Sequence, residues 1–325
     1  MTGRTPTTDI YLGSALATIP ALQAIEADAF ALGGNPAGTV IVVRKCSPAL
    51  ACRLLARPPE RLIVVMDDDL PAIVRDGGQP PGFRWRTWRA VRQGAWRLLP
   101  VADDVVVSCE ALARRTAPLV RRGHLHVLAP ALTALLPDLA HHDEGGHVRA
   151  VLLDTRSHRA DYTAIAPLLR KALDRWPMLR LTTFLGDHAP AGLVHEHAEH
   201  RAPMRWDEFR ERRGQMRHHL SLAPRRKTAV NASRSITRLL DNTMIGAAGL
   251  YGHNPAISAA LEAAGAPGWT HGLTNDDWAN ALDRMVGDAT RRKREAERTA
   301  RIGATVGDPR VQSRFWHGLL GIGTG

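Results

Sequence analysis

The sequence has few aromatic residues, few cysteines and no long apolar run. Phe, Trp and Tyr make up 5% of its 325 residues, so the core must depend on Leu, Val, Ile and Ala. Three cysteines, with no close C-x-x-C pair, argue against a disulfide framework and favour a cytoplasmic protein. No run approaches the roughly 18 apolar residues of a membrane span, and no repeat of solenoid length is present.

The charge is strongly positive, with a formal net value of +11. A basic surplus favours anionic partners, which include nucleic acid, phosphorylated small molecules and an anionic membrane face. Much of the surplus is Arg, which suits bidentate phosphate contacts, although a GC-rich coding sequence would also enrich Arg. No helix-turn-helix, zinc-finger or RNA-binding signature accompanies the charge. A nucleic-acid-binding protein is therefore a weaker interpretation than the two developed below.

Short apolar runs alternate with helical patterns throughout the chain, which predicts parallel strands joined by helical crossovers. The runs are continuously apolar, as strands buried on both faces should be. Strands are expected at residues 10–12, 39–43, 62–66, 104–108, 125–128, 149–153, 179–185, 219–223 and 247–251. Helices are expected at residues 20–32, 48–56, 84–99, 110–120, 160–175, 206–217 and 231–245, with two more after residue 275.

The polar segment at residues 141–147, HHDEGGH, separates two α/β halves and is a candidate hinge. Its histidines could bind a metal. Their irregular spacing and the lack of cysteine make a solvated linker the favoured interpretation.

Two loops in the second half have the composition of anion sites. Residues 155–159, TRSHR, follow an expected strand and precede a helix, where backbone N–H groups and the helix dipole favour a phosphate. Arg156 and Arg159 would add charge-assisted hydrogen bonds, although Ser157 could serve only as a helix cap. Residues 231–235, NASRS, form a second such loop before a helix that carries Arg238 and Asp241. That pair, at i and i+3, could equally be a surface salt bridge.

Three consecutive aspartates, Asp67, Asp68 and Asp69, follow an expected strand in the first half. Adjacent carboxylates suit a divalent cation, but all three rarely converge from one loop. Capping of the next helix is an equally good explanation, and one carboxylate could still serve an acceptor hydroxyl.

A succession of motifs fills the second half: LAP at residues 222–224, NASRS at 231–235, R-x-x-D at 238–241 and Gly246. This order resembles the donor-site signature of group-1 GT-B glycosyltransferases. In that superfamily a strand-end LAP leads through FN-x-x-[KR]-S to a helix with K-x-x-E and a closing glycine. The T-R-S-H-x-x-D loop at 155–161 is also similar. The resemblance covers residues 148–252 and, more weakly, 60–130.

The resemblance implies an α/β GT-B fold, with two Rossmann-like domains whose parallel sheets face each other across a cleft. It implies an N-terminal acceptor-side domain at residues 1–143 and a C-terminal donor-binding domain at 144–307. A helix at 308–325 would pack back on the first domain.

Position by position, Asp241 matches the ribose-binding glutamate of these enzymes, and Arg156 matches a basic residue near the donor diphosphate. Ser233 stands where many relatives carry an additional glutamate. Asp67, Asp68 and Arg156 are the implied catalytic residues. The implied donor-binding residues are Arg156, Ser157, His158, Arg159, Asn231, Ser233, Arg234, Ser235, Arg238 and Asp241.

The implied activity is transfer of a sugar from a nucleoside-diphosphate sugar to a saccharide, lipid-linked or other hydroxyl acceptor in polysaccharide or glycoconjugate synthesis. The resemblance implies a hexosyltransferase-like reaction that needs no metal ion or cofactor, and it favours retention of configuration. A cytoplasmic location, including the inner face of the membrane, is expected, with no specific nucleic-acid partner. The absent glutamate supports a second interpretation, a degenerate GT-B protein that binds a nucleotide or nucleotide-sugar without catalysis.

Residues 84–97 combine Arg with three tryptophans, Trp85, Trp88 and Trp96. Such a segment could face an anionic lipid carrier or membrane surface. The more ordinary alternative is a helix packed by its tryptophans, with its arginines in solvent.

Overall fold

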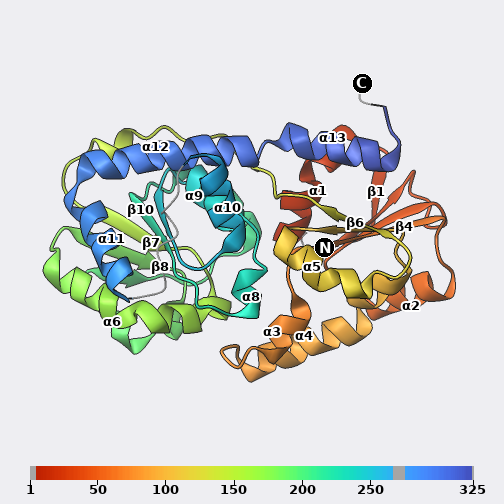
Figure 1. The fold of residues 1–325 in the computed structure, drawn as a ribbon, viewed down its shortest axis with the longest axis horizontal. Helices are drawn as coiled ribbons and strands as arrows, with labels where there is room; N and C mark the ends of the chain where they lie inside the picture. The colour runs from red at the N-terminus through yellow and green to blue at the C-terminus, as the bar shows by residue number, and fades with distance from the viewer. Residues whose placement is uncertain (1–4, 266–274, 324–325) are drawn as a thin grey trace. The chain divides into compact units, whose positions relative to one another are not determined.

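The computed structural model describes residues 5–265 and 275–323, and its chain divides into two compact units (Figure 1). Unit 1 comprises Met1–Thr133, Ser233–Ser235 and Gly307–Gly325, and unit 2 comprises Ala134–Ala232 and Ile236–Val306. Each unit contains one sheet with helices, so the predicted α/β class is confirmed. Within the described ranges, no helix has both the length and the apolar character that crossing a membrane requires.

Unit 1 contains a six-stranded sheet in the order β1-β2-β3-β4-β5-β6. The pairs β3–β4, β4–β5 and β5–β6 are parallel, whereas β1–β2 and β2–β3 are antiparallel. Strands β3, β4 and β5 are almost completely buried, as their continuous apolar runs predict, whereas the edge strand β6 is exposed or half-buried. The strands are β1 (Leu22–Glu26), β2 (Ala29–Leu32), β3 (Thr39–Val43), β4 (Arg61–Met66), β5 (Asp104–Val107) and β6 (His124–Val127).

Helices flank the sheet of unit 1, and the last helix of the chain is one of them. In α13, Trp316 Nε1 donates to the Tyr11 carbonyl (2.7 Å) and Gln312 Nε2 donates to the Ile10 carbonyl (2.9 Å), which fixes α13 against α1. The helices are α1 (Pro6–Thr18), α2 (Pro48–Ala56), α3 (Leu70–Arg75), α4 (Pro81–Gln93), η1 (Ala95–Val101), α5 (Glu110–Thr116) and α13 (Pro309–Leu320).

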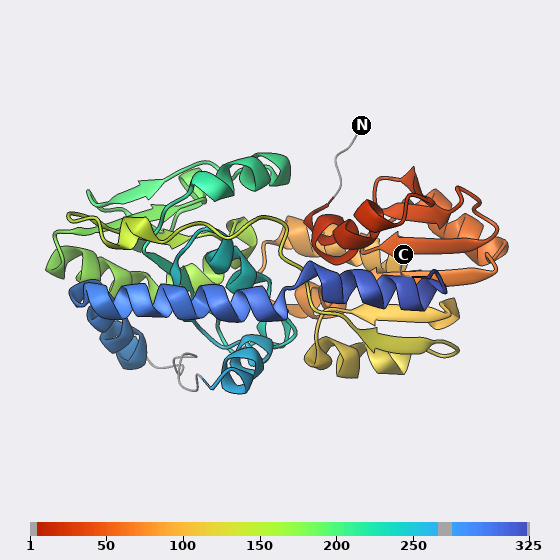
Figure 2. The same ribbon diagram turned by 90° about the horizontal axis from the view of Figure 1, so that it is seen from above.

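Unit 2 contains a five-stranded, fully parallel sheet in the order β11-β10-β7-β8-β9. Figure 2 shows α12, a helix of 18 residues, running along one side of this unit. The strands are β7 (Val148–Leu152), β8 (Leu179–Thr183), β9 (Ala198–His200), β10 (Leu220–Ala223) and β11 (Ala248–Tyr251). The helices are η3 (Ala140–His142), η4 (Arg156–His158), α6 (Arg159–Arg175), α7 (Trp206–Arg212), α8 (Ala229–Ala232), α9 (Thr237–Met244), α10 (Pro255–Ala263), α11 (Asn275–Gly287) and α12 (Ala289–Val306).

The first 32 residues differ from the sequence-based expectation. Residues 10–12, expected as a strand, lie on the buried side of α1, which starts at Pro6, a residue whose fixed φ suits the first turn. Residues 20–32, expected as a helix, form the hairpin β1–β2. Pairing of Phe30 with Ile41 of β3 adds that hairpin to the sheet, so tertiary contacts outweigh local helix preference here.

Two expected helices are interrupted. The segment at 84–99 breaks at Gly94 between α4 and η1, and a Cβ at Gly94 would lie 2.8 Å from the Ala90 carbonyl oxygen. The segment at 231–245 breaks between α8 and α9, and its end at Gly246 agrees with the prediction. Gly246 has φ of +67°, which favours glycine after a helix.

The interpretation of His141 and His142 as part of a solvated linker is wrong, although residues 143–147 are exposed. Their rings pack against His219, and each of the three Nε2 atoms lies on a backbone carbonyl at 2.9–3.1 Å. Each Nε2 therefore carries the proton. The Nδ1 atoms of His141 and His142 are buried without a partner, and that of His219 accepts from the Arg149 amide. Among the described residues, no group of three or more His, Cys, Asp or Glu could hold a metal ion.

Burial lowers the pKa of His142 to about 4, although the hydrogen bond to the Gly246 carbonyl opposes this fall, and burial followed by the charge of Arg149 lowers the pKa of His219 to about 3. A proton on Nδ1 would have no acceptor at His142 and would break a hydrogen bond at His219. Both values lie below the ordinary value of about 6.5. The unfolded chain therefore binds more protons between about pH 4 and 6.5, and stability falls as the pH is lowered through this window.

We expect the apparent free energy of unfolding to fall by about 1 kcal/mol or more between pH 7 and pH 5. The double variant His141→Gln/His142→Gln retains donors near the Nε2 positions and removes two titrating groups. Its free energy of unfolding should therefore fall less between the two pH values. Urea denaturation at both pH values measures the difference, with His124→Gln, at an exposed position, as the control. The same pH dependence in all three proteins would contradict this assignment.

Candidate functional site

The candidate site of unit 2 lies at the point where the order of strand addition in its sheet reverses. The chain leaves β7 and continues to β8 and β9 on one side, then returns to β10 and β11 on the other. Since β7 and β10 are paired, through Leu220 with Ala150 and Ser221 with Val151, their carboxyl ends are adjacent. Parallel α/β sheets bind ligands outside the carboxyl ends of strands at such a switch point.

Asp154, two residues beyond β7, is the centre of a buried ionic network. Its carboxylate pairs with Arg225 at 2.7 Å and with the Nη2 group of Arg238, and its side chain is 4% exposed. Its backbone amide donates to the Tyr162 hydroxyl (2.9 Å). Burial alone would raise the pKa of Asp154, but Arg225 and Arg238 outweigh burial and hold it well below its usual range. Asp154 is therefore a permanent anion that orients two guanidinium groups.

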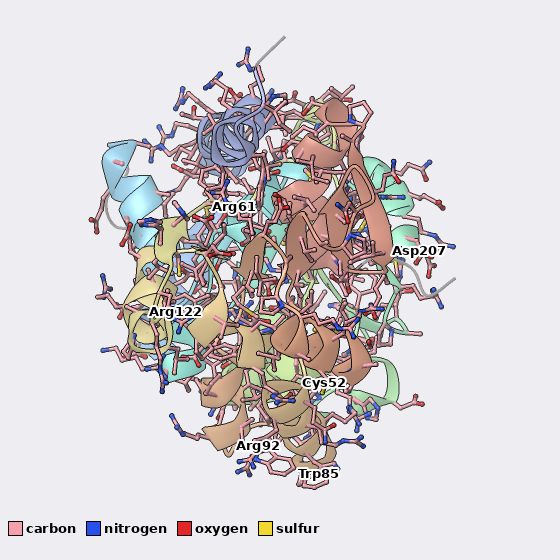
Figure 3. The ribbon with its side chains drawn as sticks, turned by 90° about the vertical axis from the view of Figure 1, so that its right-hand side faces the viewer. Cys52, Arg61, Trp85, Arg92, Arg122 and Asp207 are labelled. Carbon is pink, nitrogen blue, oxygen red and sulfur yellow. The ribbon has the colours of Figure 1, made fainter. Side chains whose placement is uncertain are left out.

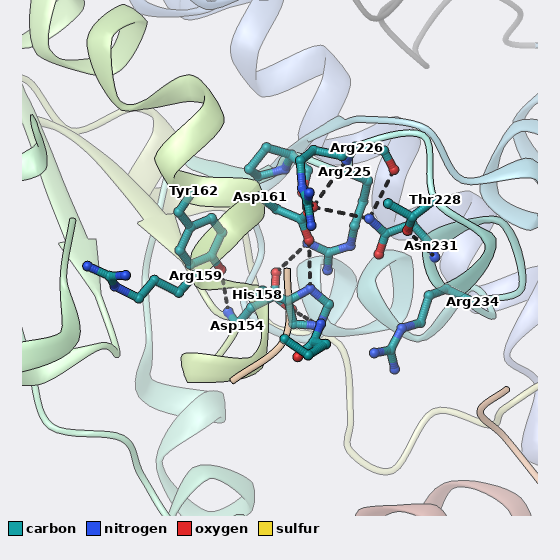
Figure 4. A network of polar contacts seen from close by, with 12 residues as sticks. Asp154, His158, Arg159, Asp161, Tyr162, Arg225, Arg226, Thr228, Asn231 and Arg234 are labelled. Atoms are coloured by element: carbon teal, nitrogen blue, oxygen red, sulfur yellow. Dashed lines mark hydrogen bonds and ion pairs between the residues drawn. The ribbon is translucent and has the colours of Figure 1, made fainter. Parts of the chain in front are cut away.

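A second carboxylate, Asp161 in the first turn of α6, organises the neighbouring loops (Figure 4). Its Oδ2 lies 3.0 Å from His158 Nδ1, and its Oδ1 accepts from the Arg226 backbone amide and Nε and from Asn231 Nδ2 at 3.1–3.2 Å. Burial opposes ionisation, but the hydrogen bond and charge of His158, followed by the arginines, lower the pKa of Asp161. Asp161 thus ties the loop after β7 to the loop after β10.

Asp241 belongs to the same network through Arg238, whose Nη1 lies 2.9 Å from Asp241 Oδ2. Burial raises the pKa of Asp241, although Arg238 opposes this rise. The predicted pair of Arg238 and Asp241 is therefore buried and joined to Asp154. It is not the surface salt bridge that the i, i+3 spacing also allowed.

The network pairs three carboxylates with three guanidinium groups, and the charge of a fourth arginine, the buried Arg213, also acts on Asp241. The carboxylates belong to Asp154, Asp161 and Asp241, and the guanidinium groups belong to Arg225, Arg226 and Arg238.

Further positive charge comes from exposed residues on the same loops. Arg156 and Lys227 are exposed beyond β7 and β10. His253, just beyond β11, has a pKa lowered by burial first and by the charge of Lys227 second. Arg159, also exposed, donates to the His188 carbonyl (2.9 Å), and Figure 4 shows its side chain directed away from Asp161. Ser157 is half-buried in η4.

The segment Ser233–Ser235 groups with unit 1. Ser233 and Ser235 are buried, and the guanidinium of Arg234 pairs with the Asp68 carboxylate. The structure thus brings His158, Asn231, Arg238 and Asp241 into one network of unit 2. The common donor site predicted for all ten residues stays a prediction.

The three aspartates after β4 have different partners. Asp69 caps α3 by accepting from the Ala72 amide at 2.9 Å, as the capping interpretation expects. Asp67 accepts from Thr7 Oγ1 (2.6 Å) and from Arg44 Nη1 (2.9 Å), and Asp68 pairs with Arg44 Nη2 (2.7 Å). Burial raises the pKa of Asp67, with Arg44 opposing. A buried carboxylate with a raised pKa is a better base than an exposed one.

Arg44 joins Asp67 and Asp68 from the carboxyl end of β3. Its φ is +56°, the only positive value among the described residues other than glycine. A left-handed conformation is costly for such a residue and persists only where surrounding contacts fix it. Here the Arg44 amide donates to the Val65 carbonyl at 2.8 Å, while the side chain bridges two carboxylates.

The sequence interpretation missed Asp154, Arg225, Arg226 and Arg44 as site residues. A signal was present for the first three, because Asp154 follows β7 closely and the basic run RRK, at residues 225–227, follows the LAP at the end of β10. No local pattern marks Arg44, since its role depends on a partner on the neighbouring strand.

A surface depression of about 1140 Å³ lies elsewhere in unit 2. It is lined by Arg149 and Arg180, each the second residue of its strand, and by Glu144, Glu199 and Arg201 among others. Arg149 and Arg201 already pair with Glu144 and Glu199, at 3.4 and 2.8 Å. Glu144 and Glu199 therefore neutralise part of the positive charge of this depression.

Comparison with known proteins gives a clear result for the fold alone. No protein-family description and no curated protein sequence matches the chain. Among solved structures, TarM of S. aureus, in a complex with UDP, fondaparinux and α-GlcNAc-glycerol, matches with a TM-score of 0.59 and 6% identity. The match covers 86% of this chain and 55% of TarM, so the chain spans little more than half the length of that protein.

Two further solved structures are similar to this chain in fold. The trehalose-6-phosphate synthase OtsA matches with a TM-score of 0.54 and 11% identity, covering 85% of this chain and 70% of OtsA. A GtfA/B complex matches with a TM-score of 0.51 and 10% identity, covering 86% of this chain and 56% of that one. The chain therefore has the GT-B fold of glycosyltransferases, as the sequence resemblance implied.

We expect Asp154→Ala to destabilise the protein by about 3–5 kcal/mol, because it leaves two buried guanidinium groups without their counter-charge. Arg156→Ala, at an exposed position on the loop beyond the same strand, should change stability by less than about 0.5 kcal/mol. Urea denaturation of both variants tests this. Equal stabilities would show that Asp154 is not the centre of the network.

Proposed function

We propose that this chain is a glycosyltransferase that moves a sugar from a nucleoside-diphosphate sugar to an acceptor hydroxyl. The observation that supports this most strongly is the buried Asp154–Arg225–Arg238–Asp241 network at the switch point of unit 2. A switch point in a parallel sheet is where nucleotides bind. On this proposal unit 2 is the donor-binding part and unit 1 the acceptor part, and the product belongs to polysaccharide or glycoconjugate synthesis.

The nucleoside end of the donor would lie against Asp241. A buried carboxylate accepts hydrogen bonds from ribose hydroxyls, and Arg238 holds this one in place at 2.9 Å. The diphosphate would lie against the loops after β7 and β10. There Arg156 and Lys227 provide charge that no carboxylate of the buried network neutralises, and the N-terminus of α6 adds its dipole.

Departure of the nucleoside diphosphate leaves negative charge on its phosphates. Positive groups positioned in advance stabilise this charge more in the transition state than in the ground state. Arg156 and Lys227 are the residues we assign to this task. The proposed reaction then needs no metal ion, so excess EDTA should leave turnover unchanged. We propose retention of configuration, which NMR of the anomeric product would test.

On the acceptor side, Asp67 is the proposed base, and Asp68 with Arg44 positions it. The raised pKa of Asp67 favours acceptance of a proton from a hydroxyl. Thr7 and Arg44 hold its carboxylate at 2.6 and 2.9 Å. We place the reaction in the cytoplasm, to which three free cysteines are suited.

The alternative is a GT-B protein that binds the nucleotide or nucleotide-sugar without catalysis. The observation that favours it is that the guanidinium groups of Arg225, Arg226 and Arg238 already pair with carboxylates of the network. Thermal-shift titration with UDP, GDP, CDP and their sugars identifies the bound nucleotide. Hydrolysis or transfer of the donor by the purified protein then separates the enzyme from the binding protein.

We expect Asp241→Asn to weaken binding of the identified nucleoside diphosphate by about ten- to a hundredfold, through loss of a charge-assisted hydrogen bond. Isothermal titration measures the dissociation constant. Asp283→Asn in α11, outside the network and paired with Arg175 and Trp176, is the control. Identical affinities for Asp241→Asn and wild type would remove the donor site from this position.

We expect Asp67→Asn to lower turnover by about a hundredfold or more while donor binding stays unchanged, because the amide cannot accept the proton. Steady-state kinetics with saturating donor, together with nucleotide titration, separates the two effects. Asp69→Asn, at the helix-capping position beside it, should change turnover much less. Full activity in Asp67→Asn would exclude this residue as the base.

A further inference from the structure

Helix α4 of unit 1 exposes two tryptophans. Trp85 and Trp88 are 58% and 38% exposed, and their rings stack with centroids 4.8 Å apart and planes at 19°. Trp96, in the following η1, is buried. The interpretation of this segment as a helix packed by its tryptophans is therefore wrong for the two in α4.

The tryptophans belong to the solvent side of the helix. At 100° per residue, Trp85, Trp88, Arg86, Arg89 and Arg92 fall within an arc of roughly 160°. All five are exposed, whereas Thr87, on the opposite side, is the one buried residue of the helix.

The remaining contacts of α4 fix this orientation. The Nε of Arg84 donates to the Val74 carbonyl (2.8 Å), which anchors α4 to α3. Figure 3 shows Trp85 and Arg92 projecting from the surface of unit 1.

The exposed arc is positively charged without compensation. Helix α4 contains no Asp or Glu, and among the described residues no carboxylate lies within 4 Å of Arg86, Arg89 or Arg92. Elsewhere in unit 1, arginines such as Arg61 and Arg115 do pair with carboxylates. Arg92 lies over the Trp88 ring at 5.6 Å, a cation–π contact that keeps its charge available.

We propose that this arc of α4, defined by Trp85, Arg86, Trp88, Arg89 and Arg92, docks the protein on an anionic lipid surface. Indole rings are amphipathic and favour the interface between lipid headgroups and acyl chains. Arginines beside them attract anionic headgroups, and a helix with this composition lies in the plane of the interface. This inference does not depend on the proposed reaction, because it concerns a different surface and its test needs no substrate.

Single-stranded nucleic acid also combines anionic charge with affinity for aromatic side chains. Base stacking needs open ring faces, but Trp88 already stacks on Trp85 and carries Arg92 over its ring. The geometry thus favours lipid, for which ring edges and a charged rim are sufficient.

The test is co-sedimentation of the full chain with vesicles of phosphatidylglycerol and phosphatidylcholine in equal parts, against vesicles of phosphatidylcholine alone. We expect binding to the anionic vesicles, little binding to the neutral ones, and release as salt is raised. Each basic residue near an anionic leaflet contributes roughly a fivefold increase in partitioning. The variant Arg86→Gln/Arg89→Gln/Arg92→Gln should therefore partition to the anionic vesicles about a hundredfold less.

Matched controls separate a defined surface from overall charge. Arg114→Gln/Arg121→Gln/Arg122→Gln removes three exposed charges from another part of unit 1 and should bind nearly as wild type does. Trp85→Ser/Trp88→Ser should partition to the anionic vesicles roughly tenfold less. Leu135→Ser, at a side chain that is 93% exposed, should partition as wild type does. Circular dichroism checks that each variant is folded.

Three results would overturn the proposal. One is the absence of binding to anionic vesicles. Another is an equal loss in the α4 variants and in their controls, which would mean that net charge alone drives binding. The third is binding to oligodeoxythymidylate, competed by neither vesicle type and lost in the tryptophan variant, which would assign the surface to nucleic acid.

Discussion

The buried carboxylate of Asp154 is the interaction on which the arrangement of unit 2 depends. Two guanidinium groups lie beside it with side chains that are 7% and 16% exposed. An arginine does not lose its charge, so leaving either group in that position without an anion would be costly. Buried ion pairs contribute little net stability compared with apolar contacts, yet loss of one partner is costly. Their effect is to fix geometry: Asp154 joins the end of β7 to Arg225 beyond β10 and to Arg238 on α9.

Local patterns were sufficient for elements that are buried on both faces or clearly capped. Strand β3 occupies the expected residues 39–43, and α2 the expected 48–56, after a cap in which Ser47 Oγ accepts from the Leu50 amide. The same reasoning failed at residues 20–32, where pairing with β3 decides the structure. The sequence shows an apolar run there but not the strand beside it.

The candidate site shows the same division between local and long-range information. The loops and helices that follow β7 and β10 contain His158, Asn231, Arg238 and Asp241, so their approximate positions could be inferred from the chain order. Arg44 could not, because its role combines a left-handed backbone with carboxylates on the next strand. The orientation of Trp85 and Trp88 was also undetermined, since a helical spacing shows which residues share a face but not which face is buried.

The distribution of charge connects these observations. In both units the carboxylates at strand ends are matched by arginines, so the buried parts of the sites contribute little to the net charge of +11. The surplus therefore belongs to exposed side chains such as those of α4 and to Arg156 and Lys227 on the loops beyond β7 and β10. Desolvation explains this division, because an uncompensated charge is tolerated only where water or an anionic partner reaches it. Surplus positive charge on a surface thus indicates where an anion can bind, whereas a buried arginine indicates carboxylates, as at Arg225, or backbone carbonyls, as at Arg292.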